Sequence, residues 1–174
     1  MTVFLVAGPP ATGKSTVARL LAESRSRSIL VDVDRIRDGM VVNGAVLPGP
    51  TWTAELVEQL VAARDSACTI ARAYARIGFD VVLDDFYDPR SRLAEYDAIA
   101  DLGPLRVVLL PHLDVARERS RFRGPGPAEY IADGIHEVYA LIGATADLAA
   151  AGWTVLDDSR ETPEQTRDRI LALA

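Results

Sequence analysis

The sequence predicts an α/β fold, a three-layer sandwich in which one parallel β-sheet lies between two layers of helices. Five short apolar runs recur along the chain, helical segments separate them, and 174 residues suit one compact domain, residues 1–174. The runs are residues 3–7, 28–31, 80–83, 105–110 and 154–156. Continuous rather than alternating apolar runs are typical of parallel strands that are covered on both faces.

The helical segments have amphipathic or alanine-rich patterns. They are predicted at residues 14–24, 53–77, 91–102, 114–121, 128–150 and 163–173. Thr53 before the second of these, Gly78 after it, and Thr162 with Pro163 before the last are ordinary helix start and stop signals. Two Gly- and Pro-rich segments, residues 41–52 and 117–127, are interpreted as loops of the same domain.

Composition restricts the class of protein. No apolar run reaches the roughly 18 residues that a membrane span needs, so we expect a soluble, cytoplasmic protein without a membrane partner. A net charge of −6 disfavours binding to nucleic acid without excluding it. Cys68, the single cysteine, is expected to be a small core residue.

The segment GPPATGKST, Gly8–Thr16, fits the pattern G-x-x-x-x-G-K-[ST] and lies between the first strand and the first helix. A loop of this kind turns backbone N–H groups toward a phosphate at a helix N-terminus. We therefore predict a P-loop NTPase fold with ATP as the cofactor. The predicted nucleotide-binding residues are Gly8, Ala11, Thr12, Gly13, Lys14, Ser15 and Thr16.

Lys14 is the only lysine in a chain with 19 Lys and Arg residues. A compact ammonium group fits beside phosphates where a broad guanidinium does not. Lys14 is predicted to bind the β- and γ-phosphates and to face solvent in the empty loop, and the Ser15 hydroxyl to bind Mg²⁺.

Two aspartates, Asp84 and Asp85, follow the apolar run at residues 80–83. A carboxylate at that strand tip can hold Mg²⁺ through its water shell. Asp84 is the predicted metal residue and Asp85 a predicted contact of the acceptor, although a plain strand-end turn would also account for both.

Asp34 lies in the segment VDVDRIRDGM, where a short helix follows the second strand. Its carboxylate should lie at the C-terminal edge of the sheet, where ligands bind in open α/β folds. There it could accept the proton of an attacking hydroxyl, while a simple helix N-cap is the alternative. Asp32 is a weaker candidate because strand alternation turns it away.

Arg119 and Arg123 are four residues apart on a helix that runs into a Gly-Pro loop. We predict a lid at residues 114–127 whose arginines neutralise the transferring phosphate, with a solvated basic face as the alternative. The uncharged loop at residues 41–52, with Trp52, is predicted to contact a partly apolar acceptor or to pack on the core.

These residues resemble the small P-loop kinases of the chloramphenicol phosphotransferase type. The shared patterns are V-D-x-x-x-D-x-M (Val33, Asp34, Asp38, Met40), two acidic residues at a strand end (Asp84, Asp85), R-x-x-x-R-G (Arg119, Arg123, Gly124) and an I-H-E (Ile135, His136, Glu137). The resemblance implies the strand order 2-3-1-4-5, Asp34 as the base and a small-molecule hydroxyl as the acceptor. It also suggests that His136 contacts substrate or the lid, for which a packed or capped helix residue is the alternative.

Asp34 and Arg37 also fit the D-x-x-R pattern of polynucleotide 5′-hydroxyl kinases, in which the arginine would hold a nucleic-acid phosphate. The sequence therefore predicts an ATP- and Mg²⁺-dependent kinase that acts on a small molecule, such as an antibiotic or another natural product. A polynucleotide kinase is the first alternative. A nucleotide-dependent switch without an acceptor is the second.

Overall fold

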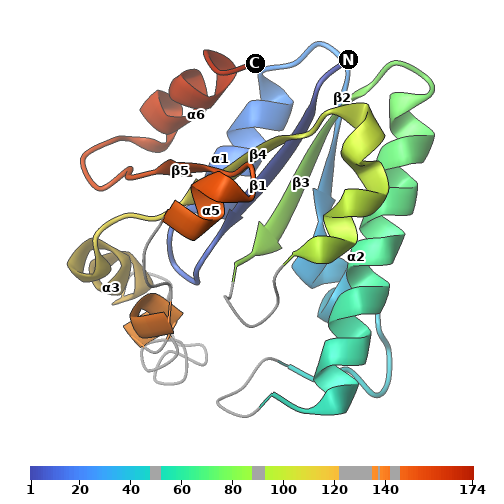
Figure 1. The fold of residues 1–174 in the computed structure, drawn as a ribbon, viewed down its shortest axis with the longest axis horizontal. Coiled ribbons are helices and arrows are strands. Elements are labelled where there is room, and N and C mark those ends of the chain that lie inside the picture. Colours follow the sequence, from blue (N-terminus) through green and yellow to red (C-terminus); the bar gives the residue numbers. More distant parts are fainter. Residues whose placement is uncertain (48–51, 88–92, 122–134, 137, 142–145) are drawn as a thin grey trace.

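The computed structural model describes residues 1–47, 52–87, 93–121, 135–136, 138–141 and 146–174. Its centre is a five-stranded sheet in which every paired strand is parallel and the order is β2-β3-β1-β4-β5 (Figure 1). The strands are β1 (Val3–Gly8), β2 (Ser28–Asp32), β3 (Asp80–Phe86), β4 (Leu105–Leu109) and β5 (Thr154–Leu156). The predicted fold class and strand order are confirmed.

Strand β3 is longer than the apolar run that predicted it. It pairs with β1 as far as Gly8, so that Asp84 lies opposite Val6 and Asp85 opposite Ala7. Asp32, the last residue of β2, lies opposite Asp84 on the other side. The two aspartates therefore belong to the strand rather than to a turn beyond it, because the ladder to β1 continues past the apolar residues.

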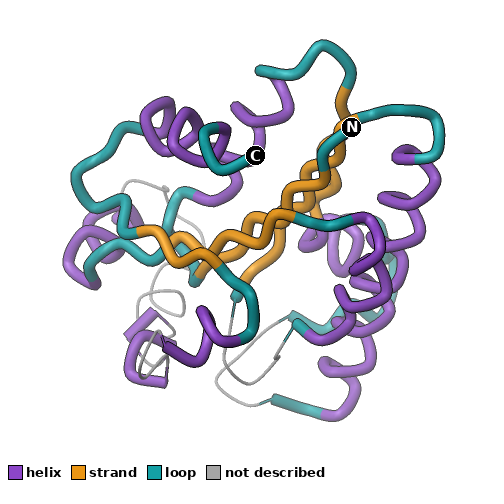
Figure 2. The backbone as a smooth tube through the Cα atoms, turned by 45° about the horizontal axis from the view of Figure 1, so that its top comes forward, coloured by secondary structure: helices purple, strands orange, loops and turns teal. Residues whose placement is uncertain are grey.

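Helices cover both faces of the sheet (Figure 2). On one face, Val82 packs in a cluster with Leu21 of α1 and Ile170 of α6. On the other, Leu83 packs with Ala67 of α2 and Ile99 of η2. The helices are α1 (Lys14–Glu23), η1 (Arg35–Gly39), α2 (Ala54–Ala75), η2 (Ala94–Leu102), α3 (Leu113–Arg121), α5 (Ala146–Ala150) and α6 (Pro163–Leu171).

Local capping explains where two helices begin. The Thr53 hydroxyl accepts a hydrogen bond from the Leu56 amide at 3.1 Å, and Thr162 forms a capping box with Gln165 at the start of α6. The helix predicted at residues 91–102 is present as a 3₁₀-helix over residues 94–102. Much of the helix predicted at residues 128–150 lies outside the described residues.

The strands all end at one edge of the sheet, where α3 extends beyond them, and both chain termini lie at the opposite end (Figure 1). Ligands of open α/β folds bind at the edge formed by the carboxyl ends of the strands. Within the described ranges, no helix is both long and apolar enough to cross a membrane.

Candidate nucleotide and acceptor site

The loop between β1 and α1 has the backbone that a phosphate cradle requires. Ala11 and Gly13 take positive φ angles of 63° and 90°, and Gly13 directly precedes α1. A Cβ atom on Gly8 would lie 2.7 Å from the Thr12 hydroxyl and 2.8 Å from the Leu109 carbonyl oxygen. Glycine is needed at position 8 because the loop returns that closely, and the first N–H groups of α1 remain available for an anion.

Lys14 is 5% exposed, so the expectation that it faces solvent in the empty loop is wrong. It lies close enough to Asp84 to lower the pKa of that carboxyl group. The ammonium group is thus buried in the loop, near a carboxylate on the neighbouring strand.

Asp84 is buried, and the contacts around it suit a hydrated metal ion. Burial raises its pKa, Lys14 and a hydrogen bond from Ser15 lower it, and Asp32 and Asp34 raise it further. Its Oδ1 atom is buried and has no hydrogen-bond partner among the residues that the structure describes. A carboxylate oxygen left unpaired beside a serine hydroxyl fits the donor set of a P-loop Mg²⁺ site.

The described residues contain no group of three His, Cys, Asp or Glu side chains that could bind a metal by themselves. That agrees with a P-loop metal site, in which nucleotide phosphates and water supply the remaining oxygens. Ser15 and Asp84 would hold Mg²⁺ there.

Asp85 has no exposed surface, which corrects the expectation that it contacts the acceptor. Its Oδ2 atom accepts hydrogen bonds from Arg64 Nε at 2.7 Å and from the Tyr96 hydroxyl at 3.0 Å. Its Oδ1 atom accepts the Phe86 amide at 2.8 Å. Strand alternation turns Asp84 toward α1 and Asp85 toward α2, so that the two neighbouring carboxylates have different partners.

Asp34 lies just before η1, with its side chain 40% exposed. It makes no side-chain capping hydrogen bond to that helix, and the capping contact comes instead from Asp32, whose Oδ1 atom accepts the Arg35 amide at 3.0 Å. Asp34 is therefore accessible and close enough to Asp84 and Asp85 to raise the pKa of both carboxyl groups.

Arg37 is buried and forms ion pairs with Asp34 at 2.9 Å and with Asp38 at 3.0 Å. Its guanidinium carbon lies 5.6 Å from the centre of the Phe86 ring. The Trp52 ring lies beside the Phe86 ring, with 6.3 Å between the two ring centroids. Phe86 and Trp52 together form what we call the aromatic wall, which lies beside the Asp34–Arg37 pair.

The segment that precedes Trp52 contacts α2 through the side chain of Gln59 and through Val46, which packs on a cluster that includes Leu56 and Leu60. Gln59 accepts the Val46 amide at 2.8 Å and donates to the Gly44 carbonyl at 2.7 Å. Val42 is 90% exposed and Leu47 63%. The described part of the predicted acceptor loop is therefore apolar, with Val46 packed on the cluster of Leu56, Leu60 and Phe86, and residues 48–51 lie outside the described structure.

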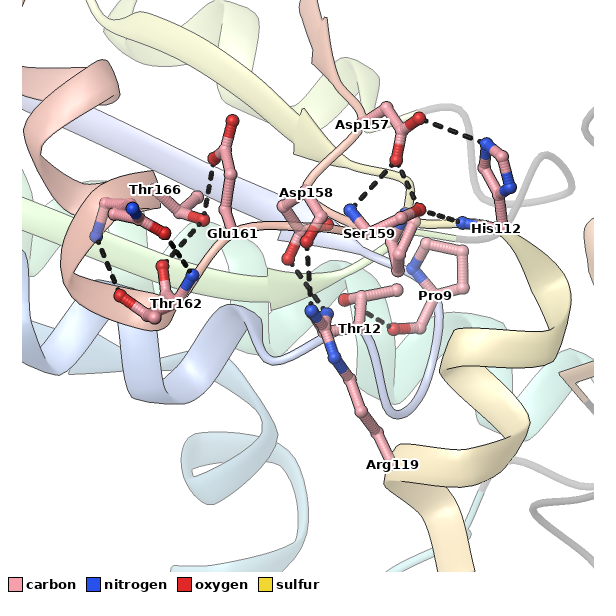
Figure 3. A network of polar contacts seen from close by, with 12 residues as sticks. Pro9, Thr12, His112, Arg119, Asp157, Asp158, Ser159, Glu161, Thr162 and Thr166 are labelled. Atoms are coloured by element: carbon pink, nitrogen blue, oxygen red, sulfur yellow. Dashed lines mark hydrogen bonds and ion pairs between the residues drawn. The ribbon is translucent and has the colours of Figure 1, made fainter.

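Arg119 extends from α3 to the P-loop and the end of β5 (Figure 3). Its Nη1 atom donates to the Thr12 carbonyl and to Asp158 Oδ2, both at 2.8 Å, and its Nη2 atom donates to the Asp158 carbonyl at 3.0 Å. Burial raises the pKa of Asp158, and Arg119 opposes that shift. In this structure Arg119 supports the phosphate loop from outside.

The rest of the predicted lid is only partly described. Arg123 and residues 122–127 lie outside the described residues, so the structure does not place that arginine. His136 is exposed, and its Nδ1 atom lies 3.1 Å from Arg117 Nη2 on α3. It contacts the lid helix rather than Asp34 or the P-loop among the described partners.

Sequence reasoning missed the ion-pair partners of Asp85 and Asp158, which are Arg64 and Arg119. Arg64 lies on the otherwise apolar buried stripe of α2, and a lone arginine there was a usable signal. Leu-Asp-Asp also occurs twice, at residues 83–85 and 156–158, each time at the end of a parallel strand. That repeat was a signal in the sequence that Asp158, like Asp85, lies at the end of a parallel strand.

A model of the family described as AAA domain matches residues 3–126, which include the P-loop, Asp34, both β3 aspartates and Arg119. No curated protein matches the sequence.

Solved structures share the fold over nearly the whole chain. A tunicamycin resistance protein from Deinococcus radiodurans is 17% identical, with a TM-score of 0.66 and coverage of 99% of this chain and 94% of that one. Shikimate kinase from Acinetobacter baumannii, solved with shikimate, is 16% identical, with a TM-score of 0.70 and coverage of 99% and 92%. A sugar kinase from a Janibacter species is 20% identical, with a TM-score of 0.63 and coverage of 99% and 93%. At these identities the likeness shows the fold, which is that of small P-loop kinases.

Proposed function

Because the chain belongs to the AAA domain family and has the fold of small P-loop kinases, we propose that it is an ATP-dependent kinase for small molecules. It transfers the γ-phosphoryl group of ATP to an alcohol. Antibiotics and other hydroxylated natural products are the first acceptors to test, since a resistance protein and two small-molecule kinases share the fold.

The chain's own residues act by positioning and by charge, which is what phosphoryl transfer requires. Lys14 and the P-loop amides hold the phosphates. Asp34 orients the acceptor hydroxyl and accepts its proton. Mg²⁺, held by Ser15 and Asp84, supplies neutralisation of phosphate charge, and lid arginines, with Arg123 as the candidate, add to it.

The observation that carries the proposal is the Asp34 carboxylate, which is partly exposed and lies near the buried Asp84. The side chain of Asp34 is 40% exposed and makes no capping hydrogen bond to η1; among the described residues its ion-pair partner is Arg37, at 2.9 Å. A nucleotide-dependent switch needs no such base. The arrangement therefore favours a kinase over a switch.

The state of Arg37 favours a small molecule over a nucleic acid. A phosphate-binding arginine of a polynucleotide kinase has to offer uncompensated charge, whereas Arg37 is 6% exposed and already paired with Asp34 and Asp38. The aromatic wall and the apolar segment before Trp52 suit a compact, partly apolar ligand held by few polar contacts.

A transfer assay with γ-labelled ATP tests the proposal on antibiotics, nucleosides, sugars and a 5′-hydroxyl oligonucleotide. We expect one small-molecule class to be phosphorylated far faster than the oligonucleotide, with a rate that depends weakly on salt. Fast labelling of the oligonucleotide that falls steeply with salt and disappears in Arg37→Ala would instead support the polynucleotide kinase. ATP binding without transfer to any acceptor would support the switch.

A further inference from the structure

The carboxyl end of β3 is fixed by a buried polar cluster that the proposed reaction does not use. Its members are Arg64 of α2, Asp85 of β3 and Tyr96 of η2, with Glu95 at the edge. Arg64, Asp85 and Tyr96 are each at most 1% exposed. Figure 1 shows α2 and η2 side by side along one flank of the sheet, and the hydrogen bonds from Arg64 and Tyr96 to Asp85 join both helices to the carboxyl end of β3.

In this cluster Asp85 forms further hydrogen bonds besides its ion pair with Arg64. The Asp85 carboxylate receives three hydrogen bonds, from Arg64, Tyr96 and the Phe86 amide, at 2.7 to 3.0 Å. A buried ion pair contributes little net stability compared with apolar side chains of the same size, because desolvating both charges is costly. What such a pair does supply is fixed geometry, since each bond has a direction.

The residues on either side of Asp85 belong to the functional site. Asp84 lies on the α1 side, beside Lys14 and Ser15. Phe86 lies on the α2 side, with the guanidinium carbons of Arg64 and Arg37 each 5.6 Å from its ring centre. At the strand end, therefore, the metal-facing carboxylate and the aromatic wall depend on the same anchored residue.

The cluster reaches the candidate base through one more step. Arg37 packs over Phe86 and forms the 2.9 Å ion pair with Asp34. Displacing Phe86 would move the surface on which Arg37 rests, and with it the partner of Asp34. A displacement of about 1 Å at a reacting group can lower a rate by roughly 10²-fold.

We infer that Asp85 and Arg64 are positioning residues for phosphoryl transfer: they fix the end of β3 so that Asp84 and Phe86 are held in place on opposite sides of it. The inference rests on the proposed function. It assigns to Asp85 a role that involves no contact with substrate, in place of the acceptor contact expected from the sequence.

The test compares Asp85→Asn with Asp80→Asn, because Asp80 is the matched carboxylate at the other end of β3, paired with Arg25 at 2.6 Å. Both variants are made in a Trp153→Phe background, so that Trp52 is the only tryptophan. We expect Asp85→Asn to shift Trp52 emission to longer wavelength and to raise the Mg²⁺ concentration needed for half-maximal binding of ATP. Turnover should fall about 10- to 100-fold, with Asp80→Asn changing none of the three.

A second variant separates positioning from stability. Arg64→Met with Asp85→Leu replaces the pair by apolar side chains of similar size and is expected to restore the free energy of unfolding. Low turnover and shifted Trp52 emission in this folded double variant would support the positioning role. Wild-type emission, Mg²⁺ requirement and turnover in it would overturn that role. A third outcome is possible, in which the variants show the expected shift of Trp52 emission but the wild-type protein phosphorylates no acceptor. That outcome would overturn the proposed function and leave the anchoring of β3 supported.

Discussion

The two ends of β3 each carry an aspartate paired with an arginine, and the two pairs are built differently. At the amino end, Asp80 and Arg25 have side chains that are 12% and 35% exposed. At the carboxyl end, Asp85 and Arg64 are at most 1% exposed. The pKa of Asp80 is lowered, because the effects of Arg25 and the Thr2 amide outweigh the opposing effect of partial burial. The pKa of Asp85 is raised, because there the effect of burial dominates.

This difference distinguishes an end that only stabilises the strand from an end that carries the candidate site. Water still solvates Arg25, so the pair at the amino end costs little to form and contributes modestly. At the carboxyl end the charges are fully desolvated, and such groups are tolerated when their geometry is needed. Changes at the carboxyl edge should therefore alter transfer, and changes at the amino edge only stability.

The largest expected effect at the carboxyl edge is that of Lys14→Ala. Transfer should fall by roughly 10³-fold, because a buried charge that neutralises the phosphates is removed. Lys14→Arg is the matched control: it keeps the charge, yet it should also fail because the guanidinium is too broad for the loop. Turnover and the circular dichroism spectrum are measured for both. Normal turnover in folded Lys14→Ala would contradict the P-loop assignment.

Asp34→Asn should lower turnover by roughly 10²-fold while leaving ATP affinity nearly unchanged, which is the usual cost of removing a general base. Asp38→Asn is its control, since Asp38 also pairs with Arg37, at 3.0 Å, without being the candidate base. Single-turnover rates and nucleotide titrations separate the two. Equal losses in the two variants would mean that Asp34 acts only by holding Arg37.

The local part of the site was predictable from the sequence, and the part made by distant contacts was not. Gly8–Thr16 is one contiguous motif between a strand and a helix, so its conformation follows from adjacent residues. The partner of Asp85 is 21 residues away on a helix, and that of Asp158 is 39 away. Such pairs depend on how helices pack on the sheet, which periodicity alone does not determine.

The same limit explains one error, at Lys14, and one alternative that the sequence left open, at Asp34. Lys14 was expected to face solvent in the empty loop, but it is buried, with a carboxylate of the neighbouring strand close enough to interact with it. Asp34 had a helix cap as its alternative, but Asp32 makes the capping contact, since the helical backbone begins before Asp34. In each case the deciding atom lies on an element whose position the local sequence does not specify.

Asp84→Asn should have opposite effects on transfer and on stability. Transfer should fall about 10- to 100-fold, the usual cost of losing a carboxylate that holds a metal through its water shell.

Without Mg²⁺ and nucleotide the Asp84→Asn variant should be more stable than wild type at neutral pH. Burial raises the pKa of Asp84, so its ionised form opposes folding there, and the difference should shrink as the pH falls toward that pKa. Thermal melts across pH, with and without MgATP, test both effects. A less stable metal-free variant would show that neutralising Lys14 outweighs the cost of burial.

The smallest expected effect is at the other end of the strand. Asp80→Asn should reduce the free energy of unfolding by about 1 kcal/mol, or the melting temperature by about 2–4 °C, and leave transfer unchanged.

The pKa of Asp80 is lowered in the fold: burial opposes ionisation, but Arg25, the Thr2 amide and the N-terminal amine favour it. The unfolded chain therefore takes up a proton at higher pH than the folded chain does, so the pair stabilises the fold above about pH 4 and that stability is lost as the pH falls through the folded pKa. Urea unfolding of wild type and variant should accordingly differ at pH 7 and converge in acid. A loss of turnover in Asp80→Asn at unchanged stability would mean that the two ends of β3 are coupled, and the division between them would fail.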